Sequence, residues 1–181
     1  ALQDKDYAQV IKAITYRNRF VSQTSDDPST AVLAALKADA EKLPQPAKAI
    51  VYAYLGDFYA AYYDQIRWVS ANRTGVSSNS DDFKTWSTRQ LIDEALRYYK
   101  LALQDEKALQ AAPTGDYIAI LTSNGSRPFM LPTLYDLLGY KILTKLSTSS
   151  FDDSRPQEAF IINNPAYFGD ARSFVKLTLP S

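Results

Sequence analysis

The chain has 181 residues, and its 20 lysine and arginine residues are balanced by 20 aspartate and glutamate residues. This length lets one domain bury most of its apolar surface without help from a metal or a disulfide. A net charge of zero provides no overall field to attract nucleic acid or an acidic membrane, so we expect neither as a partner. The absence of cysteine and histidine excludes thiolate nucleophiles, imidazole bases and the usual ligands of zinc, copper and iron.

The composition leaves the compartment open, because a lack of cysteine argues neither for nor against an oxidising environment. No stretch is typical of a membrane span, since the most apolar region is interrupted by Asp57, Asp64 and Arg67. No signal-peptide pattern precedes Ala1, and we expect the numbering to begin at a mature or engineered end.

The first part of the chain predicts a helical hairpin. Apolar residues at helical spacing predict a helix from about residue 4 to 23. They are Tyr7, Val10, Ile11, Ile14 and Val21. A polar break follows, in which Asp27, Ser29 or Thr30 could cap the next helix. That second helix is expected from about 30 to 43. Pro44 and Pro46 end it and restart the chain.

The most apolar stretch, residues 46 to 72, predicts a helix of roughly 40 Å with two apolar faces. One face carries Ile50, Tyr54, Phe58, Ala61, Tyr62, Ile66 and Val69, and the other carries Tyr52, Leu55, Tyr59 and Tyr63. A helix with two such faces needs neighbours on both. We therefore expect this stretch to be the central pillar of an all-α domain.

The second half predicts an exposed loop at about 73–85 and then a long helix from about Trp86 to Leu109, with Glu94 and Arg97 on its solvent side. A short helix capped by Thr114 or Asp116 should follow. Another is expected from Pro132, in the first helical position, to about residue 146. The tail at about 147–181 is expected to be irregular and docked by its aromatic residues.

Within the pillar, Tyr52, Leu55, Gly56 and Tyr59 have the spacing of the first helix of a tetratricopeptide repeat. The later residues Ala95, Tyr99 and Ala102 are similar to its second helix. Helical hairpins of other origins produce the same pattern, so a generic helical stack remains the alternative. The predicted fold is one all-α domain over residues 1–181, built from antiparallel helical hairpins in a tetratricopeptide-like or α-solenoid-like array with an irregular C-terminal tail.

Three acidic doublets are the first candidates for chemistry: Asp26 and Asp27, Asp81 and Asp82, and Asp152 and Asp153. Adjacent carboxylates in loops do not converge across a cleft as paired catalytic acids do, whereas helix capping suits their positions. The sequence also lacks a calcium-binding loop, a glycine-rich phosphate loop and a Ser-x-x-Lys motif at a helix start. We therefore expect no catalytic residue, no cofactor, no metal site and no enzymatic activity.

The 13 tyrosines are the remaining unusual feature. Exposed aromatic rings on a helical face can grip a peptide or stack on a sugar, although core packing is the better reading of rings at helical spacing. We take Tyr63, Trp68 and Tyr117 as the candidate contact surface for a protein or peptide partner.

Several short motifs occur in a characteristic order: NRT at 72–74, DD at 81–82, TW at 85–86, RPFMLPTLYDLL at 127–138 and PAYF at 165–168. In this order the chain, from about Val51 to Val175, resembles the amino-terminal helical region of alpha-2-macroglobulin-family proteins of Bacteroidetes. The strongest element is PTLYD at 132–136. The sequence departs from the family where FML at 129–131 separates RP from PT, and at Gly139 and Tyr140, where Ala-His is usual.

The resemblance implies a large parent polypeptide at the cell envelope, in the periplasm or at the cell surface, similar to macroglobulins that trap or inhibit proteinases. This chain would then be a non-catalytic helical module that contacts other domains of the same polypeptide. The family's thioester and bait region lie elsewhere, so none of its functional residues is carried over.

Two other functions remain open. The chain could be a carbohydrate-binding module of an outer-membrane lipoprotein for nutrient uptake, which requires a solvent-open row of aromatics. It could also be a helical enzyme that uses carboxylates alone, which requires two acids converging in a deep cleft.

Overall fold

The computed structural model describes residues 6–70, 81–120, 130–148 and 165–170. The α-helices are α1 (Tyr7–Thr24), α2 (Pro28–Lys42), α3 (Ala47–Ser70), α4 (Thr88–Leu103), α5 (Glu106–Gln110) and α6 (Leu134–Thr148). Short 3-10 helices are η1 (Phe83–Thr85), η2 (Thr114–Ile120) and η5 (Pro165–Phe168). The only extended pairing within these ranges is an isolated bridge between Pro113 and Thr133. The predicted all-α class is therefore confirmed.

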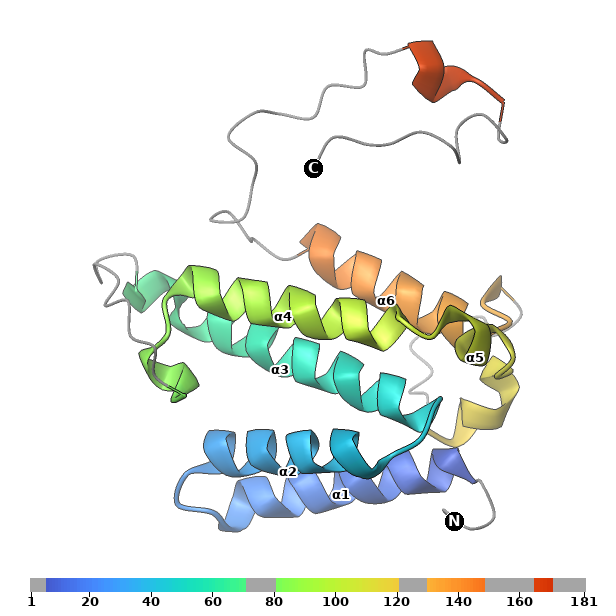
Figure 1. The fold of residues 1–181 in the computed structure, drawn as a ribbon. Coiled ribbons are helices and arrows are strands. Elements are labelled where there is room, and N and C mark those ends of the chain that lie inside the picture. The colour runs from blue at the N-terminus through green and yellow to red at the C-terminus, as the bar shows by residue number, and fades with distance from the viewer. Residues whose placement is uncertain (1–5, 71–80, 121–129, 149–164, 171–181) are drawn as a thin grey trace.

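The helices form a stack with α3 in the middle (Figure 1). The hairpin of α1 and α2 lies on one side of α3, and α4 lies antiparallel to α3 on the other side. α6 packs against α3, α4 and α5, and η2 returns to pack against α1. Because α3 contacts α1, α2, α4 and α6, both of its apolar faces find neighbours, as expected for a central pillar.

Tyr59 is the centre of an aromatic cluster between α3 and α4. Its ring is fully buried and stacks nearly parallel to Trp86, at 5.7 Å between ring centroids, and to Tyr98, at 5.8 Å. Phe58 and Phe83 meet it edge-on. Both geometries are favoured for aromatic pairs, so this cluster joins the pillar to the start and the middle of α4.

The segment before α4 differs from the predicted exposed loop. Residues 71–80 lie outside the described part, but Phe83 in η1 is buried against Phe58 and Tyr62, with ring centroids 5.4 and 4.9 Å away. The Asp82 carboxylate caps η1 by accepting a hydrogen bond from the Lys84 amide. The predicted exposure is wrong for Phe83 because burying one aromatic ring outweighs the polar character of its neighbours.

The predicted helix from Trp86 to Leu109 is two helices. The Ser87 hydroxyl and the Gln90 side chain form a reciprocal capping box, so α4 begins after Trp86. α4 ends at Leu103, and Asp105 starts α5 by accepting a hydrogen bond from the Ala108 amide at 3.2 Å. The start of α4 and the start of α5 are therefore both set by side chains that favour the N-cap position, Ser87 and Asp105.

Two other expected caps also have different outcomes. Of the three candidates Asp27, Ser29 and Thr30, it is Asp27 that caps α2, by accepting a hydrogen bond from the Thr30 amide. Thr114 instead donates its buried hydroxyl to the carbonyl of Leu131 at 2.6 Å, which joins η2 to the segment before α6.

The start of α6 also differs from the prediction. The helix begins at Leu134, and the Thr133 hydroxyl before it accepts a hydrogen bond from the Asp136 amide. Pro132 is therefore not its first residue.

Of the predicted irregular tail, residues 149–164 and 171–181 lie outside the described residues. α6 extends to Thr148, and η5 supplies one 3-10 turn in the PAYF motif.

Gly56 sets the separation of α3 and α4. A Cβ atom placed there would lie 2.5 Å from two ring carbons of Tyr99, whereas a Cβ at Gly139 would meet nothing within 4 Å. The Tyr99 hydroxyl donates to Asp57 at 3.0 Å, so the ring is held against Gly56.

We expect Gly56→Ala to lower the free energy of unfolding by about 1–3 kcal/mol through overpacking, although alanine favours a helix over glycine by roughly 1 kcal/mol. Gly139→Ala is the matched control, because it adds the same methyl group where there is space and should be neutral or stabilising. Urea unfolding followed by circular dichroism measures both variants. An equal gain in stability at both sites would contradict the close approach of the helices.

Candidate functional site

The structure buries two of the three predicted contact residues. Tyr63 and Tyr117 are each 3% exposed, so neither ring is available to a partner, and the prediction of an exposed surface there is wrong. Both rings join the hydrophobic core, and burial next to Asp116 raises the pKa of Tyr117 to about 12. Trp68 lies in the last turn of α3, where the side chains are outside the described part.

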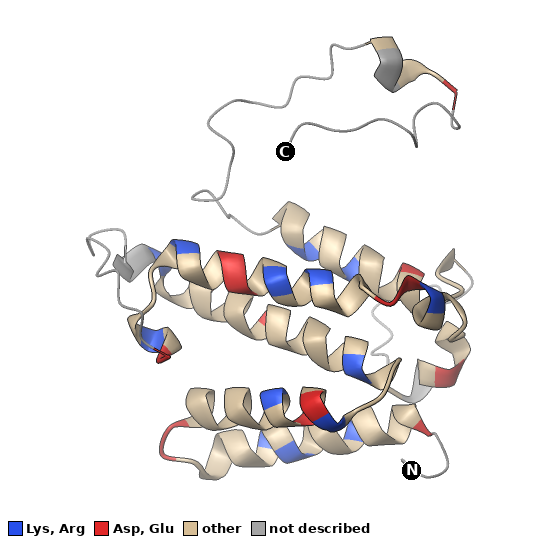
Figure 2. Cartoon of the chain, viewed as in Figure 1, with Lys and Arg blue, Asp and Glu red and all other residues tan. Residues whose placement is uncertain are grey.

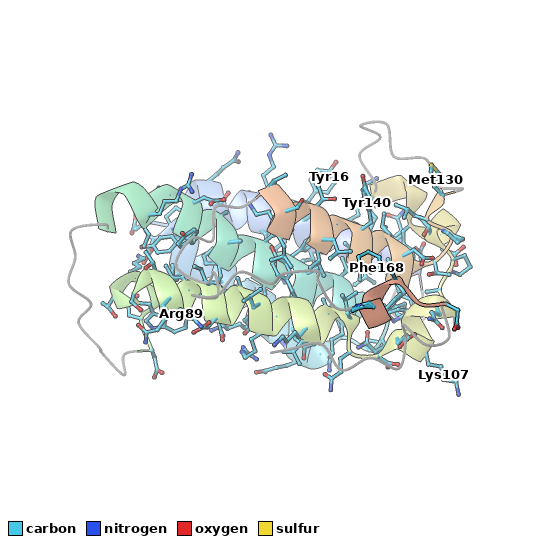
Figure 3. All side chains as sticks on the ribbon, turned by 90° about the horizontal axis from the view of Figure 1, so that it is seen from above. Tyr16, Arg89, Lys107, Met130, Tyr140 and Phe168 are labelled. Atoms are coloured by element: carbon cyan, nitrogen blue, oxygen red, sulfur yellow. The ribbon has the colours of Figure 1, made fainter. Side chains whose placement is uncertain are left out.

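The exposed apolar side chains lie instead on the outer helices. The large ones are Tyr16 and Phe20 on α1, Tyr140 and Leu143 on α6, Met130, and Phe168 in η5. Tyr16 and Phe20 are four residues apart and Tyr140 and Leu143 are three apart, so each pair shares one helix face. Figure 3 shows Tyr16 and Tyr140 projecting from the helical body. Exposed fractions of 62–67% for these four residues leave both faces open to solvent.

A groove between α2 and α4 is the second candidate site. It has a volume of about 260 Å³, and α3 forms its floor. It is lined by Lys37, Ala40 and Glu41 of α2, Tyr52 and Leu55 of α3, and Glu94, Arg97, Tyr98 and Leu101 of α4. Both signs of charge occur along α2 and α4 (Figure 2). The groove thus combines apolar walls with a charged rim, as many ligand and peptide sites do.

The charges on the α4 side neutralise each other. Arg97 donates to both carboxylate oxygens of Glu94, at 2.6 and 2.7 Å, and its guanidinium lies 4.2 Å from the ring centroid of Tyr98. The bond to Glu94 raises the pKa of Arg97. Since Glu94 is fully engaged, it is poorly placed to transfer a proton together with Glu41 across the groove.

The charges on the α2 side are different. Within the described residues, neither Lys37 nor Glu41 forms an ion pair or a hydrogen bond through its side chain. The half-buried Lys37 ammonium lies 5.9 Å from the ring centroid of Tyr59, next to the aromatic cluster. In the described part of the chain, Lys37 and Glu41 thus line the groove without a direct ion pair to each other or to another side chain.

Tyr59 lies in the core next to this groove and is not among the residues that line it. Its hydroxyl is fully buried and has no hydrogen-bond partner among the residues that the structure describes. Burial raises its pKa, and the groups that also act on it are Tyr98, Glu94 and Arg97, all of which line the groove. The hydroxyl therefore stays protonated at neutral pH, buried beneath the aromatic cluster.

Little in the sequence indicates this groove. Glu94 and Arg97 were expected on the solvent side of α4, and the charges of α2 carried no motif. Only the tyrosine pattern of the pillar pointed to Tyr52 and Tyr59 as a group, because charged residues on separate helices have no fixed spacing in sequence.

Comparison with protein-family models, with curated proteins and with solved structures finds no match to this chain. The resemblance to the alpha-2-macroglobulin family stays a prediction. In the part of the chain that the structure describes, no helix has the length and hydropathy needed to cross a membrane.

Tyr59 and Tyr99 form a natural pair of test positions. Removal of the unpartnered hydroxyl in Tyr59→Phe should leave the free energy of unfolding unchanged or raise it by up to about 1 kcal/mol, because a buried unsatisfied group is removed. Tyr99→Phe removes a bonded hydroxyl and should lower it by about 1 kcal/mol or more, because Asp57 loses a donor. Thermal and urea unfolding measure both. A loss for Tyr59→Phe as large as that for Tyr99→Phe would mean that the Tyr59 hydroxyl is satisfied in solution.

Proposed function

We propose that this chain is a non-catalytic helical module that acts through protein contacts, chiefly with other domains of a longer polypeptide. The observation that carries the proposal is the pair of open apolar faces on the two outer helices of the stack. Tyr16 and Phe20 form the α1 face, and Tyr140 and Leu143 form the α6 face.

Stacked helical arrays normally end in helices with a polar outer face, because an open apolar end lowers solubility. Here both outer helices place aromatic or aliphatic side chains outward. α6 is the clearer case, since Leu134, Leu138 and Ile142 are buried while Tyr140 and Leu143 point to solvent. A helix with apolar side chains on most of its sides is usually covered by other parts of a protein on most of its sides.

The contacts between helices also support a tetratricopeptide-like arrangement. α3 contacts its chain neighbours α2 and α4, and it also contacts α1 and α6. Such contacts between alternate helices are expected when helical hairpins stack in register. The small residue at Gly56, facing Tyr99, agrees with the repeat spacing.

For the parent protein, we propose a large extracytoplasmic polypeptide of the alpha-2-macroglobulin type that traps or inhibits proteinases. The support is the order of the sequence motifs, above all PTLYD at 132–136. A reading frame that continues after Ser181 into several β-sandwich domains is the expected finding, and a stop codon directly after Ser181 would contradict the proposal.

The alternative of carbohydrate binding receives less support from the geometry. Sugar stacking needs an accessible ring face, and Tyr98 in the groove is only 6% exposed and has Arg97 over its ring. Calorimetric titration with glycans remains the direct test of that alternative.

The lack of native cysteine allows a labelling test of the α6 face. Leu143→Cys should react rapidly with a maleimide in the isolated chain, because Leu143 is 67% exposed. In the longer polypeptide, the same cysteine should react at least about tenfold more slowly, because a neighbouring domain excludes water and reagent from that face.

The matched control is Lys100→Cys, which is exposed on α4 and away from both apolar faces. It should react at the same rate in both forms. Equal rates for Leu143→Cys in the isolated chain and in the longer polypeptide would contradict the proposed contact, as would protection of both positions.

A further inference from the structure

The outward face of α1 carries cations as well as exposed aromatic rings. Tyr16 and Phe20 are the exposed rings, and Arg19, three residues after Tyr16, is exposed as well. Lys12 lies one helical turn before Tyr16 and is half-buried. Because residues three or four apart share one side of a helix, these four side chains form a single stripe, which we call the α1 stripe.

The charge of the α1 stripe is of one sign. α1 contains three cations and no aspartate or glutamate in its 18 residues, and Figure 2 shows blue bands along this helix. Arg17 is bonded to Asp39 of α2. Within the described residues, neither Lys12 nor Arg19 forms an ion pair. The stripe therefore presents positive charge before and after Tyr16.

The exposed face of α6 differs in this respect. Its lysines Lys141 and Lys145 are paired with Asp57 and Asp64 of α3. The α6 face thus offers a partner mainly apolar contacts, whereas the α1 stripe also discriminates between partners by their charge.

The buried side of α1 argues against a membrane surface as the occupant. Val10, Ile11 and Ile14 pack in the core, which leaves two large apolar side chains on the outside. A helix that lies in a membrane interface inserts a broad apolar face, and anionic lipid is typically recognised by a cluster of about four to eight cations. The α1 stripe has neither property, so its chemistry favours a protein partner.

The spacing of the cations indicates the form of that partner. Lys12 and Arg19 are seven residues apart, which is about 10 Å along a helix. Two carboxylates that are two turns apart on a second helix have the same separation. Apolar side chains between them would lie against the rings of Tyr16 and Phe20.

We propose that the α1 stripe binds an acidic amphipathic helix of a partner domain, with carboxylates paired to Lys12 and Arg19. The apolar side chains of that helix cover Tyr16 and Phe20. This inference rests on the proposed role of the outer faces as protein contacts, and it specifies the chemistry of the partner at one of them. The rings supply contact area, and the two cations reject a basic partner.

The test uses the full 181-residue chain and a synthetic helical peptide of about 15 residues. One face of the peptide carries leucines and two glutamates that are two turns apart, and fluorescence anisotropy should show saturable binding. The same peptide with lysine in place of both glutamates should bind at least about tenfold more weakly. Vesicles that contain phosphatidylserine are a further arm and should not bind the chain.

Charge reversal of the stripe gives the sharpest variant. Lys12→Glu combined with Arg19→Glu should invert the preference, so that the lysine peptide binds at least about tenfold more tightly than the glutamate peptide. An exchange of preference is not expected from damage to the fold. Lys100→Glu, on an exposed position of α4, is the matched control and should leave both affinities unchanged.

The aromatic part of the stripe has its own matched pair. Tyr16→Ala should weaken binding of the glutamate peptide by about tenfold, because a central aromatic contact is lost. Tyr140→Ala removes an equally exposed ring from α6 and should have no effect.

Equal affinity for the two peptides would overturn the inference, as would the absence of saturable binding or binding of the vesicles in place of the peptide. Maleimide labelling of Gln23→Cys, on the same stripe, separates this inference from the proposed function. Protection in the longer polypeptide that persists after Lys12→Glu and Arg19→Glu would overturn the acidic partner and leave the protein contact standing. No protection with the native stripe would overturn the α1 contact itself.

Discussion

The contact between Gly56 and Tyr99 is the constraint on which the rest of the structure depends. With no side chain at Gly56, the ring of Tyr99 lies directly against the α3 backbone, and its hydroxyl is bonded to Asp57 in the next position. This contact brings α4 close enough to α3 for Tyr59 to stack with both Trp86 and Tyr98. α6 then packs over the same helix pair, where Lys141 reaches Asp57 at 2.5 Å. A single small residue therefore permits three helices to pack together.

The aromatic cluster belongs both to the core and to the edge of the groove. The Tyr59 ring is among the most buried in the described part of the molecule, while its hydroxyl has no hydrogen-bond partner there. The Lys37 ammonium lies 5.9 Å from the centroid of the same ring. A phenylalanine would fill the same space without an unsatisfied donor. A buried hydroxyl without a partner is uncommon in native proteins, so this position is less favourable than the packing of its ring requires.

The two ends of the stack raise a different question, which concerns solubility. An isolated helical array is stabilised by packing between neighbours, and its last helices have a neighbour on one side only. In this chain the outer faces carry four large apolar side chains that are exposed to solvent: Tyr16, Phe20, Tyr140 and Leu143. The molecule thus has two separate kinds of surface. The groove between α2 and α4 is small and has charged residues at its rim, whereas the outer faces of α1 and α6 are apolar and open to solvent.

The sequence by itself determined the all-α class and the central position of α3, and it narrowed the helix caps to a few acidic and hydroxyl side chains, because periodicity and capping are local properties. It did not reveal that Phe83 and Tyr63 are buried, that Asp105 divides the fourth helix from the fifth, or that Lys37 of α2 approaches the ring of Tyr59 on α3. These features depend on which helix faces which, and that is a property of residues far apart in the chain. Whether a tyrosine ring serves as core or as contact surface was decided by tertiary packing alone, since the same helical spacing is compatible with both.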